Sequence, residues 1–242
     1  MITEEEKARY TFTRNYWWRT GKYAIYQRLF LDYSSTGRWF LDAGAGPGHF
    51  TPWVEAVAQG TLVSLDPELG PLIYSRSKGQ QLVIQGDMQS SPFRSNFYDF
   101  VFCLEVCEHV ENDQKIIDEI YRILKPGGRA LITVPALPIL WGSHDEMSGH
   151  FRRYKKKEFS RLLQTPGFNL LKLTYAQFIF FFPLFVSRRL KKMKGQQKRD
   201  AFQVKPIVNR LLHFLVRIEY HFLKYFSLPL GTNLLGIVEK PG

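Results

Sequence analysis

The sequence has little cysteine, and its only two, Cys103 and Cys107, stand four residues apart. A strand is expected to end between them, and this spacing does not favour a structural disulfide. Unpaired cysteines of this kind are mostly small, buried hydrophobic side chains. We therefore expect a reducing, cytoplasmic setting.

A hydrophobic run long enough to cross a bilayer is also missing. The strongly apolar stretch at 178–186 contains Pro183 and falls far short of the ~20 residues that a membrane-spanning helix needs. The first six residues, MITEEE, are polar and acidic, so no secretory signal is expected. Repeats and low-complexity segments are absent, and 45% apolar residues suffice for the core of one large domain.

Acidic residues are scarce in the second part of the chain. Residues 1–150 carry 14 lysines and arginines against 18 aspartates and glutamates, whereas residues 151–242 carry 19 against 4. The first part therefore looks like an ordinary soluble enzyme core. The second should attract anions such as phospholipid headgroups, nucleic acid or an acidic substrate.

The apolar pattern that is present predicts strands alternating with helices. Helices are expected over 4–33, 49–59 and 113–124, and strands over 39–41, 61–65, 82–85, 97–104, 130–134, 170–175 and 234–239. This alternation favours an α/β fold with a parallel sheet. Such sheets bind ligands at the carboxyl ends of their strands, where Asp42, Asp66, Asp87 and Glu105 fall.

A glycine-rich turn, DAGAGPG, follows the first predicted strand at 42–48. Its glycines let the backbone approach a ligand closely. A dinucleotide fingerprint would place its third glycine at position 49, which is His49, so NAD and FAD are disfavoured. Asp66 suits the two hydroxyls of a ribose, and Asp87 could accept a hydrogen bond from an adenine amino group.

These motifs resemble the class I S-adenosylmethionine (SAM)-dependent methyltransferases over about residues 38–135. The turn at 41–48 is similar to their first motif, and 65–66, 86–88 and 124–128 are similar to later ones. The resemblance implies a Rossmann-like sheet of seven strands with the last antiparallel, SAM as cofactor, and methyl transfer. The cofactor-binding residues it implies are Asp42, Gly44, Ala45, Gly46, Gly48, Asp66, Pro67, Asp87, Met88, Leu104 and Arg19.

Within that family the chain looks most similar to the ubiquinone-biosynthesis O-methyltransferases, on the segments WWR at 17–19 and LEVCEHV at 104–110. Arg19 or Arg28 could pair with the cofactor carboxylate, or either could be a solvated helix charge. In the relatives, the Glu-x-x-Glu-His spacing of Glu105, Glu108 and His109 implies a Mg²⁺ site that activates a hydroxyl. Such a site usually has one more ligand after the fifth strand, where His144 and His150 are available. The alternative is a capping carboxylate and a packed or general-base histidine.

The segment after the fifth predicted strand is dense in histidine, arginine and tyrosine. We expect His150 to be the general base, with His109 and His144 as further candidates. Trp141, Arg152, Arg153 and Tyr154 are the predicted substrate residues, because guanidinium and phenol groups suit an anionic or hydroxylated acceptor. The alternative makes the arginines surface charges and the tyrosine a packing residue.

We divide the chain into an N-terminal helical cap (1–37), a core (38–176), a basic, aromatic helical insertion (177–230) and a last strand (231–240). Leu211, Leu215, Ile218, Phe222 and Phe226 would line one face of a helix in the insertion, with Arg217, His221 and Lys224 on the other. Such a pattern fits contact with an anionic membrane, a lid over the substrate, or a homodimer interface. Nucleic acid is not an expected partner, because no RNA-binding signature is present.

The sequence therefore predicts a cytoplasmic SAM-dependent methyltransferase, peripheral on the inner face of the membrane if the insertion binds lipid. Its expected acceptor is a hydroxyl of a lipid-like or hydrophobic small molecule. A soluble natural product or sugar, with the insertion as lid, is the alternative. A non-catalytic SAM-binding protein is the more remote one.

Overall fold

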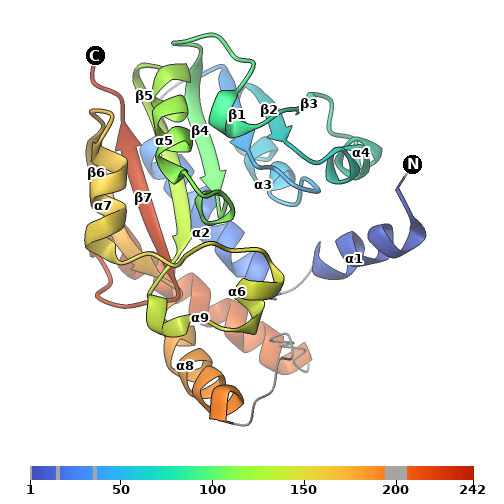
Figure 1. Ribbon diagram of the computed structural model, residues 1–242, viewed down its shortest axis with the longest axis vertical. Coiled ribbons are helices and arrows are strands. Elements are labelled where there is room, and N and C mark those ends of the chain that lie inside the picture. Colours follow the sequence, from blue (N-terminus) through green and yellow to red (C-terminus); the bar gives the residue numbers. More distant parts are fainter. Residues whose placement is uncertain (1, 15–16, 35–36, 194–205) are drawn as a thin grey trace.

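A computed structural model describes residues 2–14, 17–34, 37–193 and 206–242. Its centre is one seven-stranded sheet with the strand order β3-β2-β1-β4-β5-β7-β6 (Figure 1). The strands are β1 (Trp39–Ala43), β2 (Thr61–Asp66), β3 (Val83–Gln85), β4 (Tyr98–Leu104), β5 (Leu124–Pro135), β6 (Asn169–Ala176) and β7 (Asn233–Glu239).

The strands β1 to β5 run parallel, whereas β7 is antiparallel to both of its neighbours. Nearly every residue of β1, β2 and β7 is buried, as expected for strands covered by helices on both faces. The predicted seven-stranded, Rossmann-like sheet with an antiparallel last strand is confirmed.

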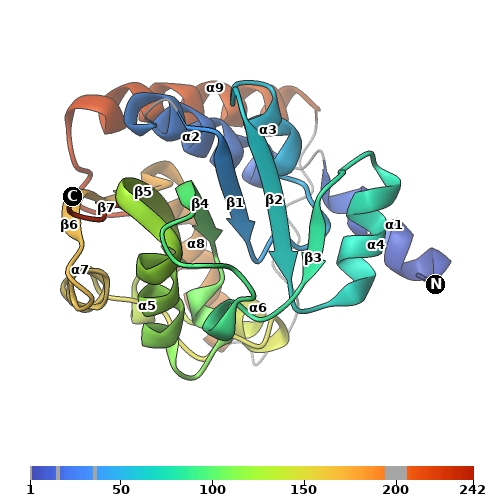
Figure 2. The ribbon, with the colours of Figure 1, turned by 90° about the horizontal axis from the view of Figure 1, so that it is seen from above.

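Helices cover both faces of the sheet. Figure 2 shows α2, α3 and α9 on one face and α5 and α7 on the other. The helices are α1 (Glu4–Arg14), α2 (Trp17–Tyr33), α3 (Thr51–Glu55), α4 (Leu69–Ser77), α5 (Asp113–Ile123), α6 (Ser143–Met147), α7 (Lys156–Gln164), α8 (Phe178–Met193) and α9 (Pro206–Tyr225), with 3₁₀ turns η1 (Met88–Ser90), η2 (Cys107–His109) and η3 (Pro138–Leu140). The helix predicted over 113–124 buries Ile116, Ile117, Ile120 and Ile123.

Three predicted elements differ from the structure by more than two residues at an end or by a division. The helix expected over 4–33 corresponds to two described helices, α1 and α2. The helix expected over 49–59 is shorter in the structure and ends at Glu55. The fifth strand begins six residues earlier than expected, at Leu124. The backbone explains this extension, because Gly127 N donates to Lys240 O at 2.8 Å and Lys240 N donates to Gly128 O at 2.9 Å.

The structure also shows the environment of the cysteines and of the insertion. Both cysteines are buried and unpaired, as expected. The insertion forms α8 and α9, and residues 194–205 between them lie outside the described part, with Lys194, Lys198 and Arg199. Across the described residues, every helix is too short or too polar to span a membrane.

Candidate functional site

The glycine loop bends sharply where β1 ends. Gly44 and Gly46 have φ angles of 76° and 54°, in the left-handed region that favours glycine. A Cβ on Gly44 would overlap Val106 in the turn after β4, so this glycine is also needed for packing. A Cβ on Gly46 would meet no atom within 4 Å among the described residues, so the backbone there faces open space. Gly46 is therefore the point where a ligand can approach the main chain.

Two carboxylates lie beside this loop. The Asp66 carboxylate at the end of β2 accepts hydrogen bonds from Gly46 N at 2.7 Å and from Glu68 N at 2.9 Å. Asp42 is only 2% exposed, and its Oδ2 receives no hydrogen bond from the described residues. Burial and the nearby Asp66 charge raise the pKa of Asp42 to about 7. The two buried carboxylates thus lie together beside the loop, at the carboxyl edge of the sheet, and both can accept further hydrogen bonds.

This edge fits the cofactor that the resemblance implies. The amino group of SAM is a cation, and the unpartnered Asp42 oxygen is a buried acceptor that such a cation would satisfy. Asp66 keeps further lone pairs for ribose hydroxyls, because a carboxylate can accept about four hydrogen bonds and the described residues supply two. The donor and acceptor chemistry is therefore consistent with SAM.

The other predicted cofactor residues lie around the same edge in different environments. Asp87 is exposed and caps η1 by accepting Gln89 N at 2.8 Å. Met88 is 4% exposed and packs into the core, so its own side chain is largely taken up by packing. Pro67 is exposed, and Leu104 is half-buried at the end of β4. Their roles toward the cofactor stay predictions.

Glu105, predicted as a metal ligand, is instead held in an ion pair. Lys22 Nζ on α2 lies 2.6 Å from both Glu105 oxygens, and Asn233 Nδ2 donates to Glu105 Oε1 at 2.5 Å. Burial alone would raise the pKa of Glu105, but Lys22, Asn233 and the more distant Arg19 lower it to about 2. Arg19 therefore lies close enough to act on this pair, one helical turn before Lys22. Sequence reasoning missed Lys22, although its spacing of three from Arg19 was a usable signal.

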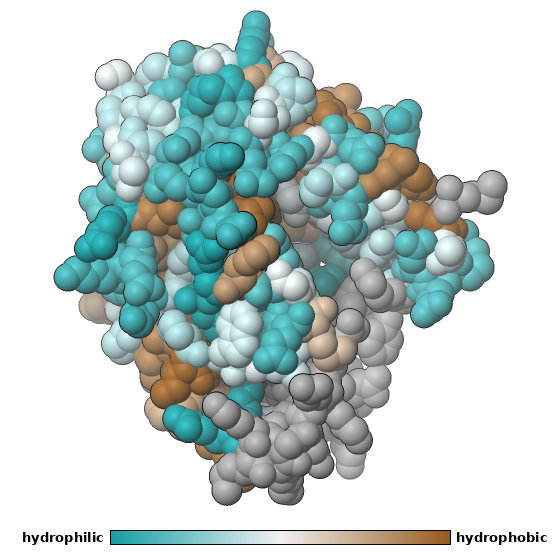
Figure 3. Space-filling view, viewed as in Figure 1, coloured by the Kyte–Doolittle hydropathy of each residue, from teal (hydrophilic) through white to brown (hydrophobic). Residues whose placement is uncertain are grey.

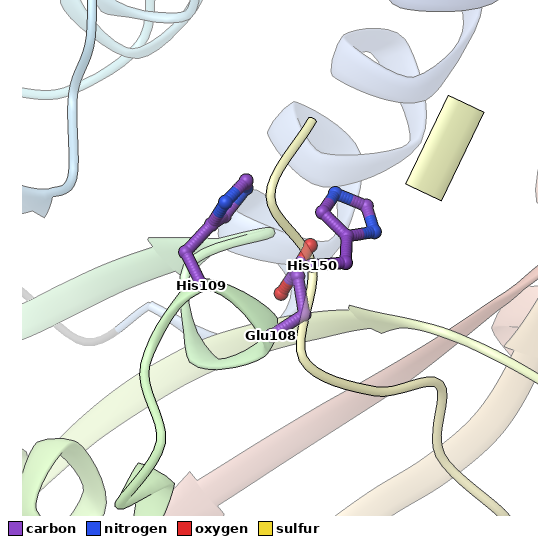
Figure 4. A group of neighbouring side chains, drawn as sticks. All are labelled: Glu108, His109 and His150. Carbon is purple, nitrogen blue, oxygen red and sulfur yellow. The ribbon is translucent and has the colours of Figure 1, made fainter. Parts of the chain in front are cut away.

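A second group forms where Glu108, His109 and His150 meet. Figure 4 shows the Glu108 carboxylate between the two imidazoles, with Glu108 and His109 on the turn after β4 and His150 on the segment after α6. One ligand atom from each lies within 4.8 Å of the other two. Glu108 is 1% exposed, and its Oε2 has no hydrogen-bond partner among the described residues. Burial and the charge of Glu105 raise the pKa of Glu108 well above its usual range.

The predicted Mg²⁺ site of Glu105, Glu108 and His109 needs a correction. Both oxygens of Glu105 face Lys22, so one carboxylate and two imidazoles remain. Mg²⁺ prefers oxygen ligands, usually carboxylates and water, whereas imidazole suits ions such as zinc or iron. The donor set that the structure brings together therefore does not fit Mg²⁺, and no step of the reaction is assigned to it.

His150 is oriented by a buried aspartate that sequence reasoning missed. Asp145 of α6 is fully buried, and its Oδ1 lies 3.1 Å from His150 Nδ1. Arg153 Nε and Arg188 Nη1 donate to the same carboxylate at 2.8 and 3.0 Å. Burial alone would raise the pKa of Asp145, but His150 and the two arginines hold it well below its usual range. An ionised Asp145 can only accept, so Nδ1 of His150 carries the proton and Nε2 is left as an acceptor.

The other two histidines stand near His150. The His109 and His150 rings lie 4.7 Å apart and perpendicular, and the His144 ring lies 6.2 Å from His150. Both His109 and His144 are exposed, whereas His150 is half-buried. The structure thus brings the three predicted catalytic histidines together. Among them, a hydrogen bond to a buried carboxylate is described for His150.

The predicted substrate arginines and tyrosine make internal contacts in the structure, and their roles toward a substrate stay predictions. Arg152 donates to Glu111 O at 2.6 Å, and Arg153 donates to Ala136 O at 2.9 Å as well as to Asp145. Tyr154 is 4% exposed, and its hydroxyl donates to Asp113 Oδ2 at 2.7 Å. These side chains brace the loops around the site. Trp141 is 38% exposed and remains available to a substrate.

Part of the chain is similar to known proteins. A family model described as a methyltransferase domain matches residues 41–132. A relative from Mycolicibacterium smegmatis, described as a probable S-adenosylmethionine-dependent methyltransferase, is 28% identical over 159 residues, which make up 64% of this chain and 60% of the relative. The ubiquinone/menaquinone biosynthesis C-methyltransferase UbiE of Yersinia pestis is 28% identical over 144 residues, 54% of this chain and 57% of the relative. The chain thus spans about 60% of the length of these curated relatives.

Solved structures share the fold. A methyltransferase structure from Bacillus halodurans superposes with a TM-score of 0.61 at 21% identity, over 90% of this chain and 99% of the other. The family match covers the glycine loop, both carboxylates beside it and the turn with Glu108 and His109. The chain therefore has the fold of class I methyltransferases, and its residues 41–132 match the methyltransferase domain model.

Proposed function

We propose that the protein transfers the methyl group of SAM to a hydroxyl oxygen of a lipid-like or otherwise hydrophobic small molecule. The observation that carries the proposal is the pairing of His150 with a buried, ionised Asp145 at the carboxyl edge of the sheet. The turn that bears Glu108 and His109 reaches the glycine loop through Val106, which packs against Gly44. A proton acceptor and the expected cofactor edge are thus parts of one site.

The reaction is an in-line displacement in which the sulfur–methyl bond breaks and an oxygen–methyl bond forms. The leaving sulfur keeps the electron pair and becomes the neutral thioether of S-adenosylhomocysteine. The hydroxyl proton passes to Nε2 of His150, whose Nδ1 proton stays on the hydrogen bond to Asp145. The protein mainly orients the two reactants and keeps water out.

Exposed apolar side chains beyond β5 support a hydrophobic acceptor. Ile139 and Phe151 are both 56% exposed, and Met147 is 50% exposed, on the segments that carry Trp141 and His150. A polar acceptor would give these side chains nothing to cover them. The relative from Yersinia pestis is named for ubiquinone and menaquinone biosynthesis, and it is a C-methyltransferase, so a carbon acceptor is an outcome the test must be able to detect.

The test uses the full chain with SAM labelled on its methyl group. It is incubated separately with a lipid extract, a soluble metabolite extract and an RNA pool. We expect the label in the lipid fraction, with the product's methyl group on oxygen, and a loss of at least roughly a hundredfold in His150→Asn. SAM binding without transfer to any pool would contradict the proposal and favour a non-catalytic SAM-binding protein.

A soluble natural product or sugar is the second candidate acceptor, with residues 177–230 as a lid. One observation favours it: Arg188 of α8 reaches into the site and binds Asp145, so the insertion forms part of the wall. Label in the soluble fraction alone would support this candidate. Loss of activity with a chelator, restored by zinc or iron, would add a metal at Glu108, His109 and His150. For localisation, we propose a cytoplasmic protein that attaches peripherally to the inner face of the membrane.

A further inference from the structure

The insertion presents apolar side chains to solvent along one face of α8. Phe182, Val186 and Leu190 are 57%, 53% and 50% exposed, and they follow one another at a spacing of four. The opposite face, with Phe180, Leu184 and Arg188, is buried against the rest of the protein. One face of this helix is therefore buried by packing. The other is an apolar stripe that nothing in the described structure covers.

The neighbouring helix α9 has the same construction. Val216, Glu219 and Leu223 are buried, and α9 packs against α2. Phe214, Ile218 and Phe222 are 59%, 36% and 55% exposed, and Tyr225 and Phe226 extend this stripe with 72% and 65%. The face predicted from sequence is thus partly the uncovered one, because Ile218, Phe222 and Phe226 point away from the core. Helices α8 and α9 contact each other, so the two stripes belong to one end of the molecule (Figure 1).

The insertion that carries these stripes is rich in basic residues, and two of the described ones, Arg189 and Lys224, are exposed beside them. Residues 177–230 carry 11 lysines and arginines against 2 acidic residues, of which Glu219 is buried. Arg189 stands over the Phe185 ring at 5.3 Å, and Lys224 over the Tyr225 ring at 5.7 Å. Figure 3 shows hydrophobic surface next to strongly hydrophilic residues over the lower end of the molecule, where α8 lies. Apolar side chains interleaved with cations are what an anionic, oily surface binds.

We propose that the exposed stripes of α8 and α9 bind the surface of an anionic lipid bilayer. The aromatic and aliphatic side chains enter the boundary between headgroups and acyl chains, and the basic residues pair with lipid phosphates. Each basic residue at such a surface strengthens binding roughly fivefold. The inference rests on the proposed function only in its choice of a lipid-like acceptor. A bilayer bound at this surface would hold such an acceptor near the site, because Arg188 links α8 to Asp145.

Other occupants fit less well. Two copies of the chain meeting through this surface would bring two regions of net charge +9 together, and like charges oppose that contact. A nucleic acid would match the charge, but Val186, Leu190 and Ile218 can neither stack on bases nor hydrogen-bond to them. Bilayer lipid uses both the aliphatic side chains and the cations.

The experiment is flotation of the full chain with vesicles in a density gradient at low salt. One set of vesicles is phosphatidylcholine alone, and the other contains equal parts phosphatidylcholine and phosphatidylglycerol. We expect the protein to float with the anionic vesicles and to stay at the bottom with the neutral ones. Added salt should release it, because surface charge is screened. No methyl transfer is measured, so this result does not depend on whether the acceptor has been identified correctly.

Matched variants assign the binding to the stripes. Leu190→Ser should lower vesicle binding about tenfold, whereas Leu82→Ser, at a leucine that is 42% exposed far along the sequence, should leave it unchanged. Arg189→Glu with Lys224→Glu should lower it at least about 25-fold, and Lys115→Glu on exposed α5 surface is the charge control. Unchanged SAM binding in each variant shows that the fold is intact.

Three results would overturn the proposal. The first is equal flotation with neutral and anionic vesicles. The second is equal binding by Leu190→Ser and Leu82→Ser. The third is a wild-type dimer in sedimentation that Leu190→Ser dissociates, because this would assign the surface to a second copy of the chain.

Discussion

At the scale of single residues, Asp42 is a buried carboxyl whose protonation responds to pH near neutrality. Burial and the charge of Asp66 raise its pKa to about 7, and the described residues donate no hydrogen bond to its Oδ2. In the unfolded chain an aspartate has a pKa of about 3.9. Without a ligand, the contribution of Asp42 to stability is therefore greatest below about pH 4 and declines as pH rises to about 7. A bound cation would reverse this by favouring the charged carboxylate.

We predict that SAM binding depends on the ionisation of Asp42. Affinity should fall about tenfold for each pH unit below about pH 7, because the carboxyl must lose its proton before it can hold the SAM ammonium. Calorimetry from about pH 5 to about pH 8, in buffers of different ionisation enthalpy, measures both the affinity and the released proton. Asp42→Asn should bind SAM weakly and without this slope. A wild-type affinity that is flat across the range would disprove the role of Asp42.

The site residues that could be predicted from sequence are those whose position follows from the residues next to them in the chain. Asp42 and Asp66 stand directly at strand ends, and their place in the sheet follows from the apolar pattern before them. Lys22 and Asp145 gain their meaning from partners far along the chain, 83 residues away for Lys22 and Glu105 and 43 for Arg188 and Asp145. Such pairings depend on which elements pack together, and a single sequence does not show that.

At the scale of elements, the Asp145 carboxylate ties α6 to α8 and to the segment before α7. It is fully buried, and both arginines that bind it are less than a tenth exposed. A buried charge pair contributes little to the free energy of unfolding compared with apolar packing. Losing one partner, however, leaves the remaining charges buried without a counter-charge. Asp145 is thus the group that fixes the insertion and His150 relative to each other.

We predict that Asp145→Asn destabilises the fold by about 3 kcal/mol, because Arg153 and Arg188 are left buried without a counter-charge. Urea unfolding measures the change in the free energy of unfolding. Asp118→Asn, on the exposed side of α5, should stay within about 0.5 kcal/mol of wild type.

The same variant tests whether Asp145 positions His150. Its methyl-transfer rate should fall roughly a hundredfold or more while SAM affinity stays unchanged, because only the imidazole loses its orienting partner. Restored stability in the double variant Asp145→Asn with Arg188→Met, without restored activity, would separate positioning from folding. Wild-type activity in Asp145→Asn would remove His150 as the oriented base.

Element types were more predictable than their ends and faces. The helix at α5 was evident because four isoleucines repeat on one side. The start of β5 was not, because it depends on pairing of Leu124 with Tyr98 of β4 and on backbone hydrogen bonds between the glycines and Lys240 near the other end of the chain. The buried face of α9 could not be read from periodicity, since apolar residues occur all around that helix and its packing against α2 buries Val216 beside Gly21.

At the scale of the whole molecule, the strand order makes the end of the chain part of the core. Strand β7 lies between β5 and β6 and is hydrogen-bonded to both. Residues 177–230 therefore interrupt one sheet and do not follow a finished domain. The predicted core of 38–176 contains β5 and β6, but the strand that joins them arrives only after the insertion.

We predict that a chain truncated after residue 230 does not unfold cooperatively. It would lose Leu234, Leu235, Ile237 and Val238, all at most 1% exposed, and would leave the inner edge of β5 without a partner. At about 2 kcal/mol for each side chain, the loss of about 8 kcal/mol is comparable to the whole stability of a typical domain. Calorimetric melting compares this chain with one truncated after Lys240, which keeps all of β7 and should melt like wild type. A cooperative transition and SAM binding in the shorter chain would mean that β7 is not needed to hold the sheet together.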